Sequence, residues 1–355
     1  MHATAGPFGA FAKTMLTILL LAATLGGIVP PHAEAPNGLA PNGQGNVLVV
    51  KHAGATRTYK PQAGAIREMV AEGLRHFTAK PTVRDAWLSL ISTQDTIGLK
   101  VHSAPGETSG TRPSVVAAFI ETLLDAGVPP AKIVIWDRRS VELRLAGFYE
   151  LAARYGVAIT SALDEGYDLS RAYEAPLVGK PVYGDLEFGK KGEGVGRKSY
   201  LSNLLTHRIT RIVNITPLLN HNYAGVSGAL YGLAIASVDN TLRFEDKQRL
   251  ETAIPEIFAL PEIADRVVLN VVDALICQYQ GEENTRLHDS TALNELWFST
   301  DPVAVDTLAL QALEREKGED PRKAPGKMIY SNASLMELGV ADPSKIKVER
   351  IQIGK

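Results

Sequence analysis

The fold class is decided by residues 96–137, which read TIGLKVHSAPGETSGTRPSVVAAFIETLLDAGVPPAKIVIWD. A short apolar run at 97–101 is typical of a buried strand, and a second such run follows at 133–136. Between them, small residues lead to Pro113, a residue favoured in the first turn of a helix. Apolar residues then recur on one side of this helix, and Gly127 is expected to close it. This order of strand, helix and strand predicts an α/β fold.

The same alternation continues along the rest of the chain. Continuous apolar strands between amphipathic helices predict a mainly parallel β-sheet with helices on both faces. The length suits one large domain or two interlocked α/β lobes. The expected strands are 47–50, 96–101, 133–136, 157–159, 211–215, 267–275, 295–298 and 347–353. The expected helices are 63–77, 113–126, 141–155, 200–205, 226–234, 244–259, 302–316 and 328–338. The glycine-rich, charged segment 178–198 is expected to be an extended or hairpin insertion.

Composition excludes several classes of protein. The formal net charge is −2, so no basic excess exists to attract nucleic acid. The single cysteine, Cys277, cannot form an intrachain disulfide, a four-cysteine iron–sulfur site or a thiolate zinc site. Because Cys277 follows the apolar run 267–276, we expect it to be a buried small hydrophobe rather than a nucleophile.

The first 35 residues have the pattern of a signal peptide. Lys13 precedes the apolar stretch 15–29, and residues 33–35, Ala-Glu-Ala, present small residues where signal peptidase cuts. This stretch is shorter than the roughly 20 residues of a membrane span. Pro36 would hinder the cut, so an uncleaved membrane anchor is the alternative. We expect an exported protein, periplasmic or extracellular, with a signal peptide at 1–35, a flexible tether at 36–45 and an α/β domain at 46–355.

Polar side chains follow several expected strands at points where a core would exclude them. They are Lys51 and His52, Lys100 and His102, Asp137 with Arg138 and Arg139, Asn220 to Asn222, and Asp273. In open parallel sheets, ligands bind beyond the carboxyl ends of the strands, so we expect these side chains to meet at one rim. The alternative is that these side chains are ordinary loop residues, since strands end in loops and loops are polar.

The loop 102–113 is the sharpest candidate ligand site on this rim. Its small residues allow backbone N–H groups to approach a ligand, and Arg112 adds positive charge at the start of a helix. Lys100, His102, Thr111 and Arg112 are therefore expected to bind a phosphate or a carboxylate. The loop lacks the Gly-Lys-Ser/Thr of a P-loop and any Gly-x-Gly-x-x-Gly. The alternative role of Thr111 is to cap its own helix, and the two roles can coexist.

A second candidate cluster surrounds His221. This histidine lies between Asn220 and Asn222 and suits a proton carrier or a metal ligand. Three residues of the segment 237–244 are expected to orient it or to contact an anion: Asp239, Asn240 and Arg243. The spacing matches no zinc motif such as His-Glu-x-x-His, and a loop-bracing histidine is the alternative.

Asp301 and Asp306 lie five residues apart and therefore on different faces of a helix, which argues against a paired acid–base role. Asp301 is expected to be the N-cap before Pro302, and Asp306 needs a partner if it is buried.

Taken together, these segments resemble the family named domain of unknown function 362. The motifs that carry the resemblance are Lys100, TSGTRPSVVAAFIETLLDAGV at 108–128, the strand 133–137, ITPLLNH at 215–221, SGALYGL at 227–233, VDA at 272–274 and TDPVAVDTLA at 300–309. The resemblance covers about 95–353, with a core at about 95–310. It implies an α/β architecture remotely akin to the nickel-pincer lactate racemases.

The chain departs from this family in two ways. Some members carry a ferredoxin module, which one cysteine cannot supply, so no iron–sulfur cluster is expected. Members usually have lysines near the turn of His221 and in the stretch after it, where this chain has Leu219 or Asn220, and Tyr231. An anion that relied on those lysines would bind differently or not at all.

Two functions fit these observations. The first is an enzyme that acts on a small carboxylate or phosphate, with or without a divalent metal. In it, Lys100 and Arg112 hold the anion, and His221 and Asp273 are the catalytic candidates. The second is a non-catalytic protein that uses the same rim to hold a ligand or cofactor. Membrane contact is expected only if the leader stays uncleaved.

Overall fold

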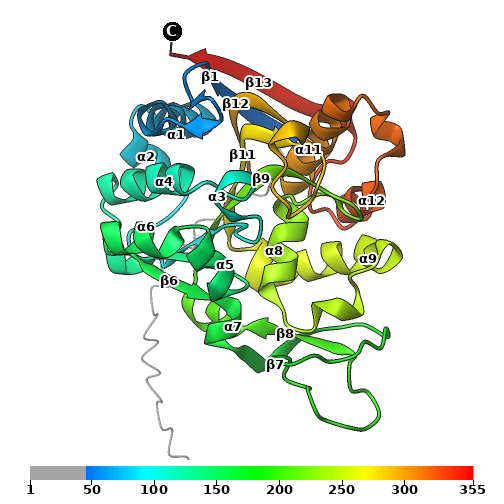
Figure 1. Ribbon diagram of the computed structural model, residues 1–355. Helices are drawn as coiled ribbons and strands as arrows, with labels where there is room; N and C mark the ends of the chain where they lie inside the picture. The colour runs from blue at the N-terminus through cyan, green and yellow to red at the C-terminus, as the bar shows by residue number, and fades with distance from the viewer. Residues whose placement is uncertain (1–44, 355) are drawn as a thin grey trace, which may run out of the picture. The chain divides into compact units, whose positions relative to one another are not determined.

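The computed structural model describes residues 45–354 (Figure 1). The expected signal peptide and nearly all of the expected tether lie outside the described residues. The first described residue, Gly45, already belongs to strand β1.

A mainly parallel sheet forms the centre of the described residues, as the sequence predicts. Its strands follow the order β13-β1-β12-β11-β9-β4-β5-β6, and β10 pairs with β9 off this path. Strand β12 runs antiparallel to both of its neighbours, whereas β11, β9, β4, β5 and β6 are mutually parallel. The bounds are β1 Gly45–His52, β4 Ile97–Lys100, β5 Ile133–Asp137, β6 Ala158–Ser161, β9 Arg211–His221, β10 Gly225–Val226, β11 Val267–Gln278, β12 Ser290–Ser299 and β13 Ile346–Ile353.

Helices cover both faces of this sheet because its strands are apolar on both sides (Figure 1). In β1, Val47 and Val49 pack into one core and Leu48 and Val50 into the other. The helices over the second core are α1 Ala63–Thr78, α2 Val83–Leu88, α4 Pro113–Asp125, α5 Ser140–Leu145 and α6 Phe148–Tyr155. Those over the first core are α8 Ala229–Ser237, α9 Lys247–Phe258, α11 Pro302–Lys317 and α12 Lys327–Leu335. Three short helices complete the set: α3 Gly106–Ser109, α7 Ala162–Glu165 and α10 Pro261–Ala264.

The helix starts at Pro113 and Asp301 and the helix end at Gly127 lie where the sequence predicts them. Pro113 is the first residue of α4, and Gly127 follows its end with a left-handed φ of 92°. The Asp301 carboxylate caps α11 by accepting the Ala304 N–H at 2.7 Å.

Asp306 finds its partner at the start of another helix. Its carboxylate accepts the N–H groups of Ala229 at 2.6 Å and of Leu230 at 2.9 Å, so it closes the N-terminus of the buried helix α8.

Two expected helices are wrong in detail. The segment 200–205 begins as strand β8, Lys198–Ser202, which pairs antiparallel with β7, Tyr167–Glu174. This pairing, which no local periodicity reveals, overrides the helical pattern, and the expected insertion joins these two strands. The expected helix 141–155 is two helices, α5 and α6, because Gly147 adopts a left-handed φ of 80° between them.

None of the helices formed by residues 45–354 has the length and apolar character needed to cross a membrane.

Candidate functional site

The carboxyl ends of β4 and β5 meet through a buried ion pair. Lys100 Nζ lies 2.9 Å from Asp137 Oδ1, and the two side chains are 1% and 5% exposed. Asp137 Oδ2 also accepts the backbone N–H and the hydroxyl of Ser103. Burial alone would raise the pKa of Asp137, but Lys100, His102 and Ser103 hold it below its ordinary value. The expected anion-binding lysine therefore already neutralises a carboxylate of the protein.

Arg112 forms the second buried ion pair of the rim. Its Nη1 lies 2.8 Å from Asp273 Oδ1, and its backbone N–H donates to Asp273 Oδ2 at 3.0 Å. Neither side chain is more than 2% exposed. The pair joins the start of α4 to β11. Arg112 and Asp273, both expected to act on a ligand, therefore neutralise each other.

Thr111 links the loop after β4 to strand β9 instead of capping its helix. Its hydroxyl donates to the Ile215 carbonyl at 2.7 Å and accepts the His102 N–H at 2.9 Å. No side chain caps α4, so the expectation that Thr111 does so is wrong. The threonine instead fixes the backbone of His102 against β9.

His102 is the expected ligand-binding residue that faces an open space. It is 9% exposed, and its Nε2 has no hydrogen-bond partner. Burial lowers the pKa of His102 to about 4; Asp137 opposes this effect, while Lys100 and His221 add to it. The imidazole is therefore neutral at neutral pH and can accept a proton or a hydrogen bond.

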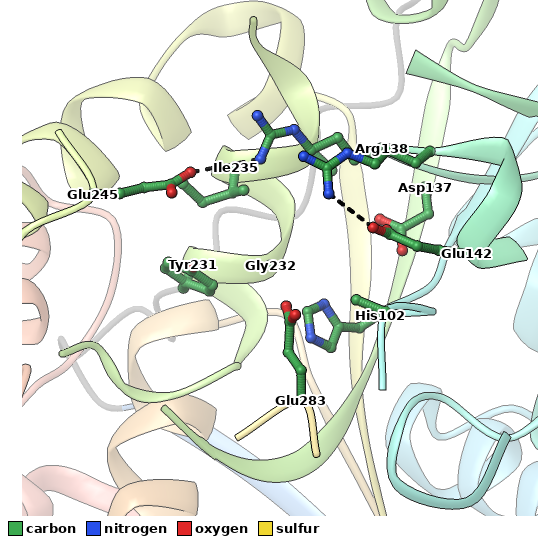
Figure 2. Close-up of a pocket in the computed structure, with 12 residues that line it drawn as sticks. His102, Asp137, Arg138, Glu142, Tyr231, Gly232, Ile235, Glu245 and Glu283 are labelled. Atoms are coloured by element: carbon green, nitrogen blue, oxygen red, sulfur yellow. Dashed lines mark hydrogen bonds and ion pairs between the residues drawn. The ribbon is translucent and has the colours of Figure 1, made fainter. Parts of the chain in front are cut away.

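A polar pocket of about 180 Å³ opens beside His102 (Figure 2). Helix α8 forms one wall, and the ends of β4 and β5 and the start of α5 form the others. The volume is below the roughly 300 Å³ of typical drug-sized sites, so the pocket suits a small ligand. Its ionisable lining residues are His102, Asp137, Arg138, Arg139, Glu142, Glu245 and Glu283.

Two arginines from the turn after β5 supply the positive charge of this pocket. Arg138 Nη1 lies 3.5 Å from Glu245 Oε1, and its Nη2 donates to the Thr241 hydroxyl. Arg139 Nη1 donates to Glu142 Oε1 at 3.0 Å, and the Arg139 side chain is 54% exposed. Sequence analysis places both arginines on the rim because they directly follow a strand, but it does not select them as ligand-binding residues.

Glu283 lines the same pocket as His102, and Figure 2 shows its carboxylate next to the His102 ring. Burial raises the pKa of Glu283, the carboxylates of Glu142 and Asp137 raise it further, and Arg139 opposes them. Glu283 is not among the expected site residues, because it lies in the loop 279–289, where no strand end, helix cap or motif marks it.

His221 lies behind the same pocket wall. Its Nδ1 accepts the N–H groups of Tyr223 at 3.2 Å and Ala224 at 3.0 Å, which is the loop-bracing role. Its ring lies 4.3 Å from the ring of Tyr231, a pocket residue. Burial lowers the pKa of His221, while Glu282 and Glu245 oppose that shift. Across residues 45–354, no group of three or more His, Cys, Asp or Glu side chains is arranged to hold a metal ion.

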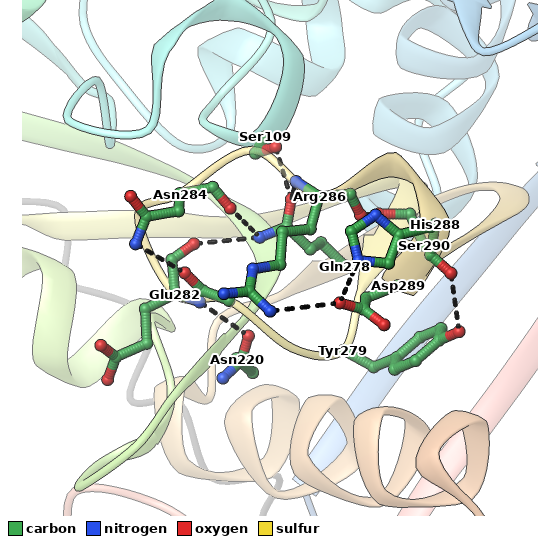
Figure 3. A network of polar contacts seen from close by, with 11 residues as sticks. Ser109, Asn220, Gln278, Tyr279, Glu282, Asn284, Arg286, His288, Asp289 and Ser290 are labelled. Atoms are coloured by element: carbon green, nitrogen blue, oxygen red, sulfur yellow. Dashed lines mark hydrogen bonds and ion pairs between the residues drawn. The ribbon is translucent and has the colours of Figure 1, made fainter.

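Asn220 and Asn222 hold the loop that carries Glu283. Asn220 Oδ1 accepts the Glu282 N–H at 3.1 Å (Figure 3). Glu282 Oε1 accepts the Asn222 N–H at 2.7 Å. Asn220 therefore holds this loop through the Glu282 backbone, and the Asn222 backbone holds it through the Glu282 side chain.

The remaining expected site residues lie at the insertion. Asp239 accepts the N–H groups of Leu186 and Tyr200, and Asn240 N–H donates to Asp185. The buried Arg243 guanidinium donates to Ser199 and to the carbonyls of Tyr173 and Leu177. The structure does not bring Asp239, Asn240 and Arg243 together with His221.

Comparison with known proteins gives a family match and one solved structure of low similarity. Residues 97–311 match the family described as domain of unknown function (DUF362). No curated protein matches the chain. A solved structure of a Thermotoga maritima protein from a structural genomics consortium is 12% identical, with a TM-score of 0.40. The similarity covers 73% of this chain and 60% of that one, so the chain spans less than two thirds of that protein's length.

Proposed function

Because this chain belongs to the DUF362 family, whose description assigns no activity, we propose its function from the pocket itself: the protein binds a small carboxylate or phosphate ligand there. The observation that carries this proposal is the pair of consecutive arginines, Arg138 and Arg139, on one wall of a small pocket.

The two arginines can exchange partners. Each is paired with a single glutamate of the pocket wall, at 3.5 Å for Arg138 and 3.0 Å for Arg139. A guanidinium presents several N–H donors in one plane and binds carboxylates or phosphates through two of them. Lys100 and Arg112, by contrast, would have to abandon buried aspartates in order to bind a ligand, which leaves an uncompensated buried charge.

The test is calorimetric titration of the full chain with inorganic phosphate and with pyruvate. We expect Arg139→Gln to weaken binding by roughly 10–100-fold, because hydrogen bonds to charged groups contribute about 1.5–3 kcal/mol. Arg322→Gln is the control, because Arg322 is 85% exposed, pairs with Asp320 and does not line the pocket. Equal affinity of both variants and the wild type would contradict the proposal.

A non-catalytic binding role is the second candidate. It is favoured by the burial of Asp273, one of the two catalytic candidates, at 0% exposure against Arg112. Turnover of any ligand that binds would separate an enzyme from a binding protein. Elemental analysis of the purified protein would show whether a divalent metal accompanies the ligand.

We also propose that residues 1–35 direct export. The pattern of Lys13, the apolar stretch 15–29 and the small residues at 33–35 supports this proposal. N-terminal sequencing of protein from the extracytoplasmic fraction should give a start at Pro36. A start at Met1 in a membrane fraction would indicate an anchored protein, and an intact cytoplasmic protein would contradict export.

A further inference from the structure

We propose that His102 and Glu283 form an acid–base pair that makes the pocket an active site for enolisation of a 2-oxo carboxylate. The inference rests on the proposed function, since Arg138 and Arg139 would hold the carboxylate of this substrate. It adds an activity and a class of substrate to the binding role.

The geometry of His102 suits a proton acceptor. Its Nε2 has no hydrogen-bond partner, although the residue is only 9% exposed. Buried polar atoms in native proteins nearly always have a partner, so each exception needs an explanation. The backbone of His102 is fixed by the Thr111 hydroxyl at 2.9 Å, and the neighbouring Asp137 is already neutralised by Lys100. The imidazole thus has a fixed backbone and a buried ring nitrogen without a hydrogen-bond partner, in a residue that lines the pocket.

The loop that carries Glu283 into the pocket is fixed by hydrogen bonds. Gln278, which is 2% exposed, donates to the carbonyls of Glu282 at 3.0 Å and Asn284 at 2.9 Å (Figure 3). Its Oε1 accepts from the Ser109 hydroxyl and the Arg286 N–H. One buried side chain therefore anchors both sides of Glu283.

The residue before Glu283 shows that this loop is held in an uncommon conformation. Glu282 has a φ of 51°, a left-handed value that residues other than glycine rarely adopt. Its N–H donates to Asn220, and its carboxylate accepts from Asn222. Such conformations persist only where surrounding contacts impose them, and they cluster at functional sites.

The charges around the pair favour neutral forms of both groups. Burial, Lys100 and His221 keep His102 unprotonated against the pull of Asp137. Burial and the carboxylates of Glu142, Asp137 and Glu282 raise the pKa of Glu283 against Arg139. The two shifts run in opposite directions, toward an unprotonated imidazole and a protonated carboxyl group, as in pairs of groups that divide the base and acid roles.

The proposed step is balanced without any oxidant or cofactor. A His102 ring nitrogen takes a proton from C3 of the substrate, and the electrons of that C–H bond form the C2–C3 double bond. The C2 carbonyl oxygen takes the proton of the Glu283 carboxyl group and becomes an enol hydroxyl. His102 leaves the step as imidazolium and Glu283 as carboxylate, and reversal with solvent protons exchanges the C3 hydrogen.

The experiment is proton NMR of pyruvate in D₂O with the full-length protein. We expect the methyl signal to decay faster than in buffer, and His102→Gln and Glu283→Gln to slow this exchange at least ~100-fold, the lower end of general acid–base contributions. Both variants should keep calorimetric affinity for pyruvate within a few-fold. The matched controls His288→Gln and Glu193→Gln replace exposed residues and should exchange like the wild type.

Asn220→Ala tests the positioning of Glu283. We expect slower exchange and a shifted pH dependence of the exchange rate, because the hydrogen bond from the Glu282 N–H to Asn220 positions the Glu283 carboxyl group. A merely structural role would lower the melting temperature and leave that pH profile unchanged.

The outcomes separate the two proposals. Binding of pyruvate without exchange overturns the acid–base pair and leaves the binding function intact, as does exchange that persists in both variants. Absence of binding to pyruvate and phosphate overturns the proposed function and the inference that rests on it.

Discussion

Replacing Asp273 with asparagine tests whether the rim is held by a charge pair. In the native protein, Asp273 Oδ1 lies 2.8 Å from Arg112 Nη1, and Oδ2 accepts the Arg112 N–H at 3.0 Å. Arg112 is 1% exposed and Asp273 is 0% exposed. Asparagine has nearly the same size and keeps one oxygen for the backbone bond, but its NH2 group then faces the Arg112 guanidinium, so the substitution removes the charge and one acceptor.

The expected loss follows from the burial of the arginine. Removing one partner of a buried ion pair costs about 3–5 kcal/mol, because the other charge stays buried without compensation. We expect Asp273→Asn to lower the free energy of unfolding by this amount. The double variant Arg112→Met, Asp273→Leu should recover most of the loss, because apolar replacement of a buried pair is often neutral or stabilising.

Urea denaturation followed by tryptophan fluorescence measures both variants. Asp320→Asn is the control, because its partner Arg322 is 85% exposed and the unfolding midpoint should not move. A loss below about 1 kcal/mol in Asp273→Asn, the range of exposed pairs, would refute the reasoning. So would a double variant no more stable than the single one.

Three further predictions concern buried or constrained groups. Burial raises the pKa of Asp306 to about 7, so ionisation of this carboxyl group lowers the free energy of unfolding increasingly as the pH rises from about 4 to 7. Urea titrations should therefore show that the stability of Asp306→Asn relative to the wild type increases over this pH range. A stability difference that stays constant with pH would contradict this prediction. Cys277 is 0% exposed and burial raises its pKa to about 12, so Ellman's reagent should react with it only in denaturant; rapid labelling of the folded protein would disprove this. Gly326 has a φ of 71°, and a Cβ added there would lie 2.0 Å from the Ala224 carbonyl oxygen. Gly318 has a similar φ of 75°, but a Cβ added there would meet no atom within 4 Å. Gly326→Ala should therefore lower the melting temperature more than Gly318→Ala does.

The architecture could be predicted because its signals are local. Apolar runs such as 97–101 and 133–136 predict strands in any fold that buries both faces of a sheet. Pro113 and Asp301 start helices through contacts within one turn. The β7–β8 pair could not be predicted, since its register depends on strands about thirty residues apart that have no apolar alternation.

The rim could be predicted only in part. The rule that polar residues after parallel strands converge led to His102 and the two arginines, and all three line the pocket. The rule does not say which of the converging charges neutralise one another. Lys100 and Arg112 are indistinguishable from free anion-binding residues until Asp137 and Asp273 are seen against them.

The sequence by itself determined the α/β class, most of the helix starts and the edge of the sheet where polar residues gather, because each depends on neighbours within a few residues. Only the tertiary structure decided which charges remain free for a ligand and that Glu283 faces His102. The reason is physical: ion pairing and desolvation depend on distances of a few ångströms between segments far apart in the chain, and local periodicity does not encode them.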